Sequence, residues 1–124
     1  MHNQNKILGN LGENIAQDYL LENQYIIYAK NWRYGRAEAD IIALDSQAQC
    51  LVFIEVKTRK NVVFGYPEDS VTIKKQQLLF ELAGEYMHIH HYEQEFRFDI
   101  ISIIVGQHKN NQIKHYKDAF FPNW

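Results

Sequence analysis

Residues 51–57, Leu-Val-Phe-Ile-Glu-Val-Lys, constrain the fold more than any other part of this chain. Alternate residues of an extended strand point to opposite faces, and here both faces are apolar as far as Ile54. A strand of this kind is usually covered on both sides. Glu55 and Lys57 lie at its end, where an ion that loses its water without compensation is strongly destabilising. The sequence therefore requires partners for these charges, and a divalent cation is one candidate.

An acidic strand precedes this one, in Glu38-Ala-Asp-Ile-Ile-Ala-Leu44, and residues 45–50 form a polar stretch suited to a hairpin loop. If the strands fold back symmetrically, paired residue numbers sum to 95. Asp40 then lies opposite Glu55, and Glu38 opposite Lys57, all on one face. Two carboxylates so placed repel each other, and they either share a proton or hold a metal. A slip of two residues would keep the face and change the pairs.

Hydrophobic periodicity predicts two helices and five strands. Thr72 is the expected N-cap of the second helix. The order α-β-β-β-α-β-β predicts an α/β fold, a mixed sheet with helices packed on it. The expected elements are a helix over 6–22, strands over 25–32, 37–44 and 50–58, a helix over 73–88, and strands over 96–105 and 113–117.

The 124 residues suffice for one domain, residues 1–124, with a core of its own. No apolar run is long enough to cross a membrane, and the first residues lack the apolar stretch of a signal peptide. Cys50 is the single cysteine, so an internal disulfide is excluded. These observations predict a cytoplasmic protein without a membrane partner.

The formal net charge of −2 argues mildly against a dedicated nucleic-acid-binding protein. Basic residues nevertheless gather between Lys30 and Lys75, and a metal bound to the acids there would leave the surrounding surface positive. Lys74 and Lys75 open the second helix, where a phosphate would be favourable. The residues expected to contact a nucleic-acid backbone are Lys30, Arg33, Arg36, Arg59, Lys60, Lys74 and Lys75.

An acid on one strand followed by Glu-x-Lys on the next resembles the PD-(D/E)xK nuclease superfamily, and further segments extend the likeness over nearly the whole chain. Together they resemble the small bacterial YraN-like family of predicted endonuclease-fold proteins. The segments are Gly9-Asn-Leu-Gly-Glu-Asn-Ile-Ala16, Asn31-Trp-Arg33, Glu38-Ala-Asp-Ile-Ile42, Val52-Phe-Ile-Glu-Val-Lys-Thr-Arg59, Phe64-Gly-Tyr-Pro67, Lys74, Arg97-Phe-Asp99 and Asp118-Ala-Phe120.

The resemblance implies a restriction-endonuclease-like fold similar to that of Holliday-junction resolvases. By position it makes Asp40 and Glu55 ligands of Mg²⁺ or Mn²⁺, with Glu13 completing the site, and it gives Lys57 the role of orienting the attacking water. The family usually has Gly-Glu-Ile-Asp-Leu-Ile where this chain has Ala37-Glu-Ala-Asp-Ile-Ile. The acids are kept, while alanines replace a glycine and a large apolar residue.

The reaction so implied is metal-dependent hydrolysis of phosphodiester bonds in DNA, branched or single-stranded, catalysed by Asp40, Glu55 and Lys57. Resolvase-like nucleases suggest a homodimer by analogy. The alternative is a non-catalytic module that binds nucleic acid or protein and retains the nuclease fold. Its support is the acidic net charge and the undefined activity of the family.

Several of these residues also have structural interpretations. Glu55 with Lys57 can be an ordinary ion pair, and Glu13 a solvated helix charge. Trp32 and Tyr34 can stack on unpaired bases, but such residues more often pack. Asp99 beside Arg97 predicts a buried hydrogen bond or ion pair. The spacing of His88, His90 and His91 fits no zinc motif, so we expect them to be solvated at the end of the second helix.

Overall fold

The computed structural model describes residues 2–60, 71–106 and 110–122, with side chains from Lys6 onward. Its element order confirms the predicted α-β-β-β-α-β-β arrangement. The quoted segment Phe64-Gly-Tyr-Pro67 lies outside the described residues. The elements are α1 (His2–Glu22), β1 (Tyr25–Tyr34), β2 (Ala37–Asp45), β3 (Cys50–Arg59), α2 (Ile73–Ile89), β4 (Phe96–Ile104) and β5 (Gln112–Phe120).

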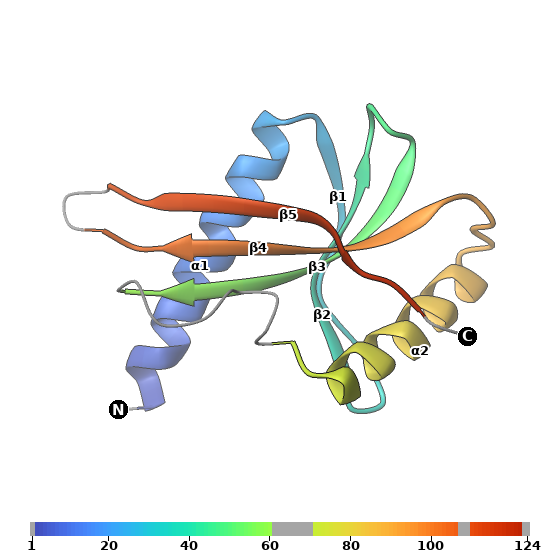
Figure 1. The fold of residues 1–124 in the computed structure, drawn as a ribbon, viewed down its shortest axis with the longest axis horizontal. Helices are drawn as coiled ribbons and strands as arrows, with labels where there is room; N and C mark the ends of the chain where they lie inside the picture. The colour runs from blue at the N-terminus through green and yellow to red at the C-terminus, as the bar shows by residue number, and fades with distance from the viewer. Residues whose placement is uncertain (1, 61–70, 107–109, 123–124) are drawn as a thin grey trace.

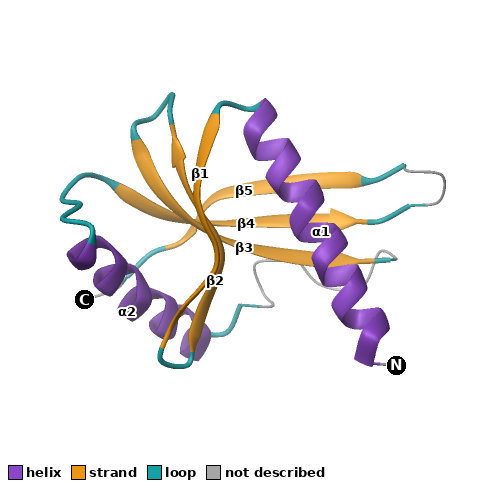
Figure 2. Cartoon of the chain, turned by 180° about the vertical axis from the view of Figure 1, so that it is seen from behind, coloured by secondary structure: helices purple, strands orange, loops and turns teal. Residues whose placement is uncertain are grey.

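The five strands form one sheet in the order β1-β2-β3-β4-β5. Neighbouring strands run antiparallel except β3 and β4, which are parallel. Helix α1 covers one face and α2 the other (Figures 1 and 2). This arrangement explains the doubly apolar β3: Phe53 packs in the core under α2, whereas Val52 and Ile54 pack in the core under α1. The mixed sheet flanked by helices is thus confirmed.

The last strand is longer than its sequence pattern predicts. It runs over Gln112–Phe120 in place of the expected 113–117. Its first residues are exposed, and β5 lies at an edge of the sheet, so only its later residues, such as Tyr116 and Phe120, reach the core under α2. A strand with one mostly polar stretch carries little hydrophobic periodicity. The sequence pattern therefore predicts a strand that is too short at both ends.

The β2–β3 hairpin has the predicted register. Its pairs run from Ile41 with Ile54 to Asp45 with Cys50, and each pair sums to 95. Asp45 fixes the turn, because its Oδ1 accepts hydrogen bonds from the backbone N–H groups of residues 47 and 48, at 3.2 and 3.3 Å. Such a side-chain acceptor stabilises a turn directly.

The regular alternation of β2 is interrupted at Asp40. Ala39 and Ile42 both pack in the core under α2, whereas Ile41 between them packs in the core under α1. On the neighbouring strand, Asn31 has a positive φ of 53° and falls at the same gap in the β1–β2 register. Backbone pairing with β3 ends one residue away, at Ile41 and Ile54. The two strands separate there, beside the start of α2.

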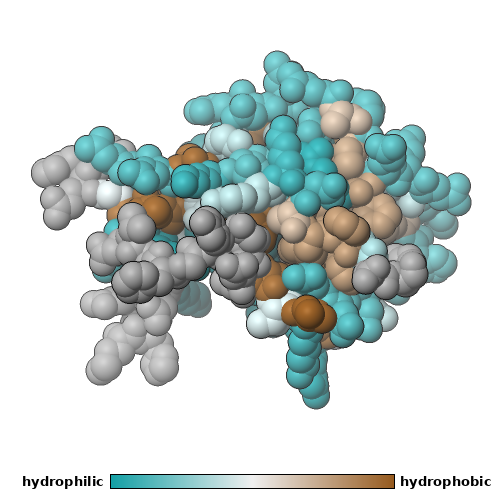
Figure 3. Space-filling view, in the orientation of Figure 1, coloured by the Kyte–Doolittle hydropathy of each residue, from teal (hydrophilic) through white to brown (hydrophobic). Residues whose placement is uncertain are grey.

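Hydrophilic residues cover much of the face seen in Figure 3, while hydrophobic residues gather on the side where α2 lies. Among the residues that the structure describes, neither helix is both long and apolar enough to cross a membrane.

Candidate functional site

A small pocket opens where β2 and β3 separate, facing the first turns of α2. Its volume is about 160 Å³. It combines carboxylates from two strands with cations from the β1–β2 turn and from α2, above an apolar floor. The lining residues are Arg36, Ala37, Glu38, Asp40, Glu55, Lys75, Leu78 and Leu79.

Asp40 is held at the pocket by the break in β2. Its Oδ2 accepts a hydrogen bond of 2.8 Å from the backbone N–H of Val56, in the part of β3 where the β2–β3 backbone pairing has stopped. Burial, and next the neighbouring Glu55 carboxylate, raise the pKa of Asp40 to about 7. The charge of Glu13 acts in the same direction. A carboxylate with so high a pKa, beside another acid, is typical of a functional site.

Glu55 lies on the face of β3 that packs against α2, and only 5% of the residue is exposed. Its Oε1 is 2.5 Å from Lys75 Nζ and 3.6 Å from Lys57 Nζ. Among the described side chains, Oε2 is a buried polar atom without a hydrogen-bond partner. A buried carboxylate oxygen without a partner is costly, so this atom is suited to bind a ligand.

Lys57 and Lys75 approach Glu55 from different elements. Burial lowers the pKa of Lys57, although Glu55 opposes that effect. Burial also disfavours the charged form of Lys75, but its hydrogen bond to Glu55 outweighs it and raises the pKa of this ammonium. Lys75 is positioned by the helix start, where Thr72 is the N-cap as predicted and its hydroxyl accepts a 3.2 Å hydrogen bond from the backbone N–H of Lys75.

The donor set fits a hard divalent cation held by two carboxylates. Mg²⁺ usually keeps several waters and takes one or two protein carboxylates together with a substrate phosphate. Asp40 and Glu55 would supply those oxygens, including the Oε2 that lacks a partner. Among the described side chains, no three His, Cys, Asp or Glu residues are arranged to hold a metal. The fit therefore concerns a two-carboxylate site.

Glu13 lies outside the residues that line the pocket, although its charge reaches Asp40. Helix α1 comes very close to β3 here: a Cβ on Gly12 would lie 1.8 Å from Thr58 Oγ1. This contact brings α1 against the strand that carries Glu55 and Lys57. Glu13 is half-buried beside it, as a neighbouring charge at the site.

The sequence profile of the uncharacterised protein family UPF0102 matches residues 12–103. This chain belongs to that family. It is 43% identical over 115 residues to a UPF0102 protein of Bacteroides thetaiotaomicron, covering 93% of each chain. A UPF0102 protein of Clostridium botulinum strain Kyoto is 41% identical over 123 residues, covering 97% of this chain and 98% of the relative. Another, from Flavobacterium psychrophilum, is 40% identical over 114 residues, covering 92% and 93%.

The basic residues expected to bind nucleic acid fall at different places in this UPF0102 chain. Arg36 and Lys75 line the pocket, and Lys74 is exposed next to it on α2. Lys60 is exposed and Arg59 half-buried at the end of β3. Lys30 lies toward α1, where its Nζ is 3.4 Å from Asn14 Oδ1.

Arg33 is engaged with an acid rather than free for a phosphate. Its Nε lies 2.7 Å from Glu38 Oε2, across the β1–β2 pair. The β2–β3 backbone register ends at Ile41 and Ile54, so the predicted pair of Asp40 with Glu55 is not part of it, although both residues line the pocket. The predicted pair of Glu38 with Lys57 is not part of the register either. Lys57 pairs with Glu55 on its own strand instead.

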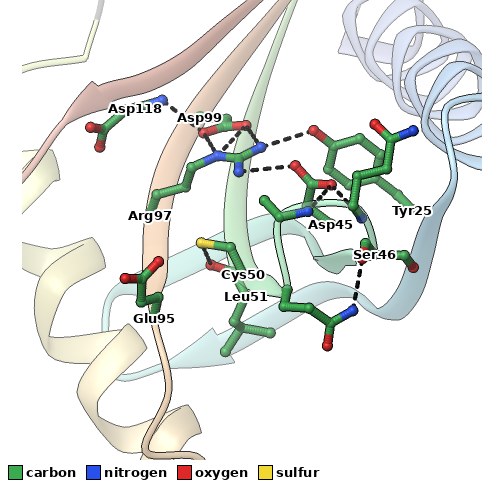
Figure 4. Close-up of polar contacts among 12 residues, drawn as sticks. Tyr25, Asp45, Ser46, Cys50, Leu51, Glu95, Arg97, Asp99 and Asp118 are labelled. Atoms are coloured by element: carbon green, nitrogen blue, oxygen red, sulfur yellow. Dashed lines mark hydrogen bonds and ion pairs between the residues drawn. The ribbon is translucent and has the colours of Figure 1, made fainter.

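Asp99 belongs to a second buried cluster, which reaches Asp45 at the turn of the β2–β3 hairpin (Figure 4). It is fully buried, and its carboxylate accepts hydrogen bonds from Arg97 Nε at 3.0 Å and from the backbone N–H of Asp118 at 2.9 Å. His115 Nε2 lies 2.7 Å from it, and Arg97 also reaches Asp45 at 3.0 Å. The predicted structural ion pair of Asp99 with Arg97 is confirmed.

Trp32 and the three clustered histidines follow their structural interpretations, whereas Tyr34 is exposed and does not pack as that interpretation expects. Trp32 packs edge-on against Tyr86 of α2, with ring centroids 5.1 Å apart. His88, His90 and His91 are exposed at the end of α2, as expected. Tyr34 is 43% exposed at the end of β1.

The sequence predicts Lys75 as a phosphate-binding residue and does not indicate its contact with Glu55. The signal for that contact is weak: the helical spacing from Lys75 to the apolar Leu79 indicates which of two adjacent lysines points toward the sheet. Lys75 and Leu79 are four residues apart, and therefore on the same helix face, and Leu79 is buried in the core. Lys74 lies off that face and is exposed.

Proposed function

We propose that this chain is a metal-dependent nuclease that hydrolyses phosphodiester bonds in DNA. The observation that supports this most is the pair of pocket carboxylates, Asp40 with a raised pKa and Glu55 with a buried Oε2 that lacks a partner. Two acids forced together in this way favour a bound cation, which removes their repulsion. Lys57 lies on the same strand face, as the chemistry requires.

The size of the pocket favours a polymeric substrate. At about 160 Å³ it is smaller than the roughly 300–1,000 Å³ of pockets that enclose whole small molecules. A single phosphate can enter it while the rest of a nucleic acid lies across its mouth. The exposed Lys60 and Lys74 lie at the ends of β3 and near the start of α2, where a backbone can pass. These features support a nucleic acid as the substrate, and the proposal names DNA, branched or single-stranded.

Mg²⁺ or Mn²⁺ bound by Asp40 and Glu55 would polarise the phosphate and lower the pKa of a bound water. The Lys57 ammonium, held 3.6 Å from Glu55, orients the attacking water and stabilises the charge that develops on the phosphate. Arg36 lines the same pocket and neutralises the non-reacting phosphate oxygens.

The test offers linear, nicked, branched and single-stranded DNA with Mg²⁺ or Mn²⁺ to the wild type and to Lys57→Ala and Asp40→Asn. We expect cleavage by the wild type and a loss of at least about a hundredfold in each variant, the scale of a removed catalytic group. Lys114→Ala, at an exposed position on β5, is the matched control and should keep full activity. Equal cleavage by Lys57→Ala and the wild type would reject the assignment.

A non-catalytic binding module is the second candidate. It is favoured by the contacts of Lys57 and Lys75 with Glu55, because two ammonium groups already balance this acid. DNA binding in the same assay, without cleavage of any substrate under either metal, would support it. A cytoplasmic location, expected from the cysteine content and the N-terminal sequence, and a homodimer, expected by analogy with resolvase-like nucleases, remain predictions.

A further inference from the structure

Glu55 is contacted by two lysine side chains that differ in solvent exposure. The Lys75 side chain is 39% exposed, reaches Glu55 from α2, and makes the shorter contact at 2.5 Å. The Lys57 side chain is 22% exposed and stands on the same buried strand as Glu55, at 3.6 Å. Only Lys75 also lines the pocket with Asp40. Lys75 is therefore the cation placed where the two carboxylates meet solvent.

A cation at this position competes with a divalent ion for the same oxygens. Lys75 Nζ holds Oε1 of Glu55, while Oε2 of the same carboxylate is buried without a partner. A divalent ion shared by Asp40 and Glu55 would lie close to the Lys75 ammonium, and like charges at such distances in a half-buried site repel strongly. The lysine stem is flexible and partly exposed, so its head group can move outward.

We propose that Lys75 holds Glu55 until a divalent cation displaces it, and that the freed ammonium then binds the substrate phosphate. This inference rests on the proposed function and adds a coupling between metal and substrate. Lys75 lies in the first turn of α2, where the helix N-terminus favours an anion, and Arg36 lines the same pocket. Once the contact between Lys75 and Glu55 is broken, a phosphate that enters the pocket can contact Lys75 and Arg36 together.

The experiment measures Mn²⁺ binding by calorimetry in the absence of nucleic acid, for wild type, Lys75→Gln and Lys75→Arg. The matched control is Lys74→Gln, which removes an exposed charge from the neighbouring position of the same helix. We expect Lys75→Gln to bind Mn²⁺ about tenfold more tightly than the wild type, since one opposing charge is lost. Lys75→Arg and Lys74→Gln should stay close to the wild-type affinity.

Thermal unfolding of the same variants gives a second readout. In EDTA, Lys75→Gln should unfold at a lower temperature than the wild type, because buried Glu55 loses its shortest ion pair. In saturating Mn²⁺ it should gain more stability than the wild type gains, because tighter binding to the folded state stabilises it more. Lys74→Gln should show neither change.

The outcomes separate this inference from the proposed function. If the wild type binds Mn²⁺, Asp40→Asn abolishes that binding, and Lys75→Gln leaves the affinity unchanged, the role of Lys75 is rejected and the metal site stands. If none of the proteins, Lys75→Gln included, binds Mn²⁺ at millimolar concentration, the metal site itself is wrong and the inference is wrong with it.

Discussion

Replacing Asp99 by asparagine tests whether the second buried cluster holds the sheet together. The carboxylate is fully buried and accepts hydrogen bonds from Arg97 Nε at 3.0 Å and from one terminal Arg97 nitrogen at 3.1 Å. It also lies 2.7 Å from His115 Nε2 and accepts from the backbone N–H of Asp118. Asparagine keeps the shape of this side chain and removes its charge, so it leaves Arg97 without its bidentate partner.

Removing one partner of a buried ion pair costs about 3–5 kcal/mol of folding free energy. Arg97 keeps its contact with Asp45 at 3.0 Å and its hydrogen bond of 2.8 Å to the Tyr25 hydroxyl. We therefore expect the lower end, about 3 kcal/mol. That is a large fraction of the roughly 5–15 kcal/mol by which a native protein is stable.

Urea unfolding followed by circular dichroism measures the change. With an m-value of about 1–3 kcal/mol/M, a loss of this size moves the midpoint down by about 1–3 M. Glu81→Gln is the matched control, since it removes an acid charge from an exposed position on α2. A loss below about 1 kcal/mol for Asp99→Asn, similar to that for a surface position, would refute the view that this charge organises the cluster.

The same cluster predicts how stability depends on pH. Burial alone would raise the pKa of Asp99, but hydrogen bonds from His115, Arg97 and the backbone of β5 outweigh burial and lower this pKa. Burial would also raise the pKa of Asp45, but hydrogen bonds from a turn N–H and from Arg97 lower it. Both acids therefore stabilise the fold above their unfolded pKa of about 3.9, and this contribution is lost as the pH falls through the lower folded values. Urea midpoints between pH 6 and pH 2.5 should fall less steeply in Asp99→Asn than in the wild type, and parallel curves would contradict this. Gly12→Ala should destabilise the protein by about 1–3 kcal/mol, because the added Cβ would lie 1.8 Å from Thr58 Oγ1. Partial recovery of stability in the Gly12→Ala, Thr58→Ala double variant would identify this clash as the cause. Wild-type stability of the single variant would disprove it. Thr72→Ala should cost about 1 kcal/mol in urea unfolding by removing the N-cap, whereas Thr72→Ser should keep most of it.

The sequence predicts the fold well where hydrophobic periodicity and turn chemistry agree. The doubly apolar run of β3 demands cover on both faces, and α1 and α2 provide it. The sequence of the hairpin predicts which face is buried and leaves a slip of two residues open, and the turn held by Asp45 sets the observed register. These effects depend on residues close together in the chain, so they can be predicted from the sequence.

The site was only partly predictable, because it depends on a departure from regular structure. The interruption at Asp40 ends the β2–β3 pairing, and the Asp40 carboxylate accepts a hydrogen bond from the backbone N–H of Val56. A regular hairpin would instead continue the backbone pairing as far as Glu38 and Lys57. The contact of Lys75 with Glu55 depends on how α2 is set on the sheet. Neither is encoded in a local pattern, since both arise from packing between segments far apart in the chain.

The parallel pairing of β3 with β4 has a consequence for how the protein folds. Every other neighbouring pair of strands in the sheet is antiparallel, and the longest stretch of sequence between two such strands is residues 105–111, whereas residues 60–95 separate β3 from β4. Closing this long connection costs the most chain entropy, so we expect it to limit the folding rate. Glu55 and Lys57 lie on β3, and Lys75 lies within the connection. The α2 side of the pocket is therefore supplied from within that connection, and the β2–β3 hairpin alone lacks Lys75.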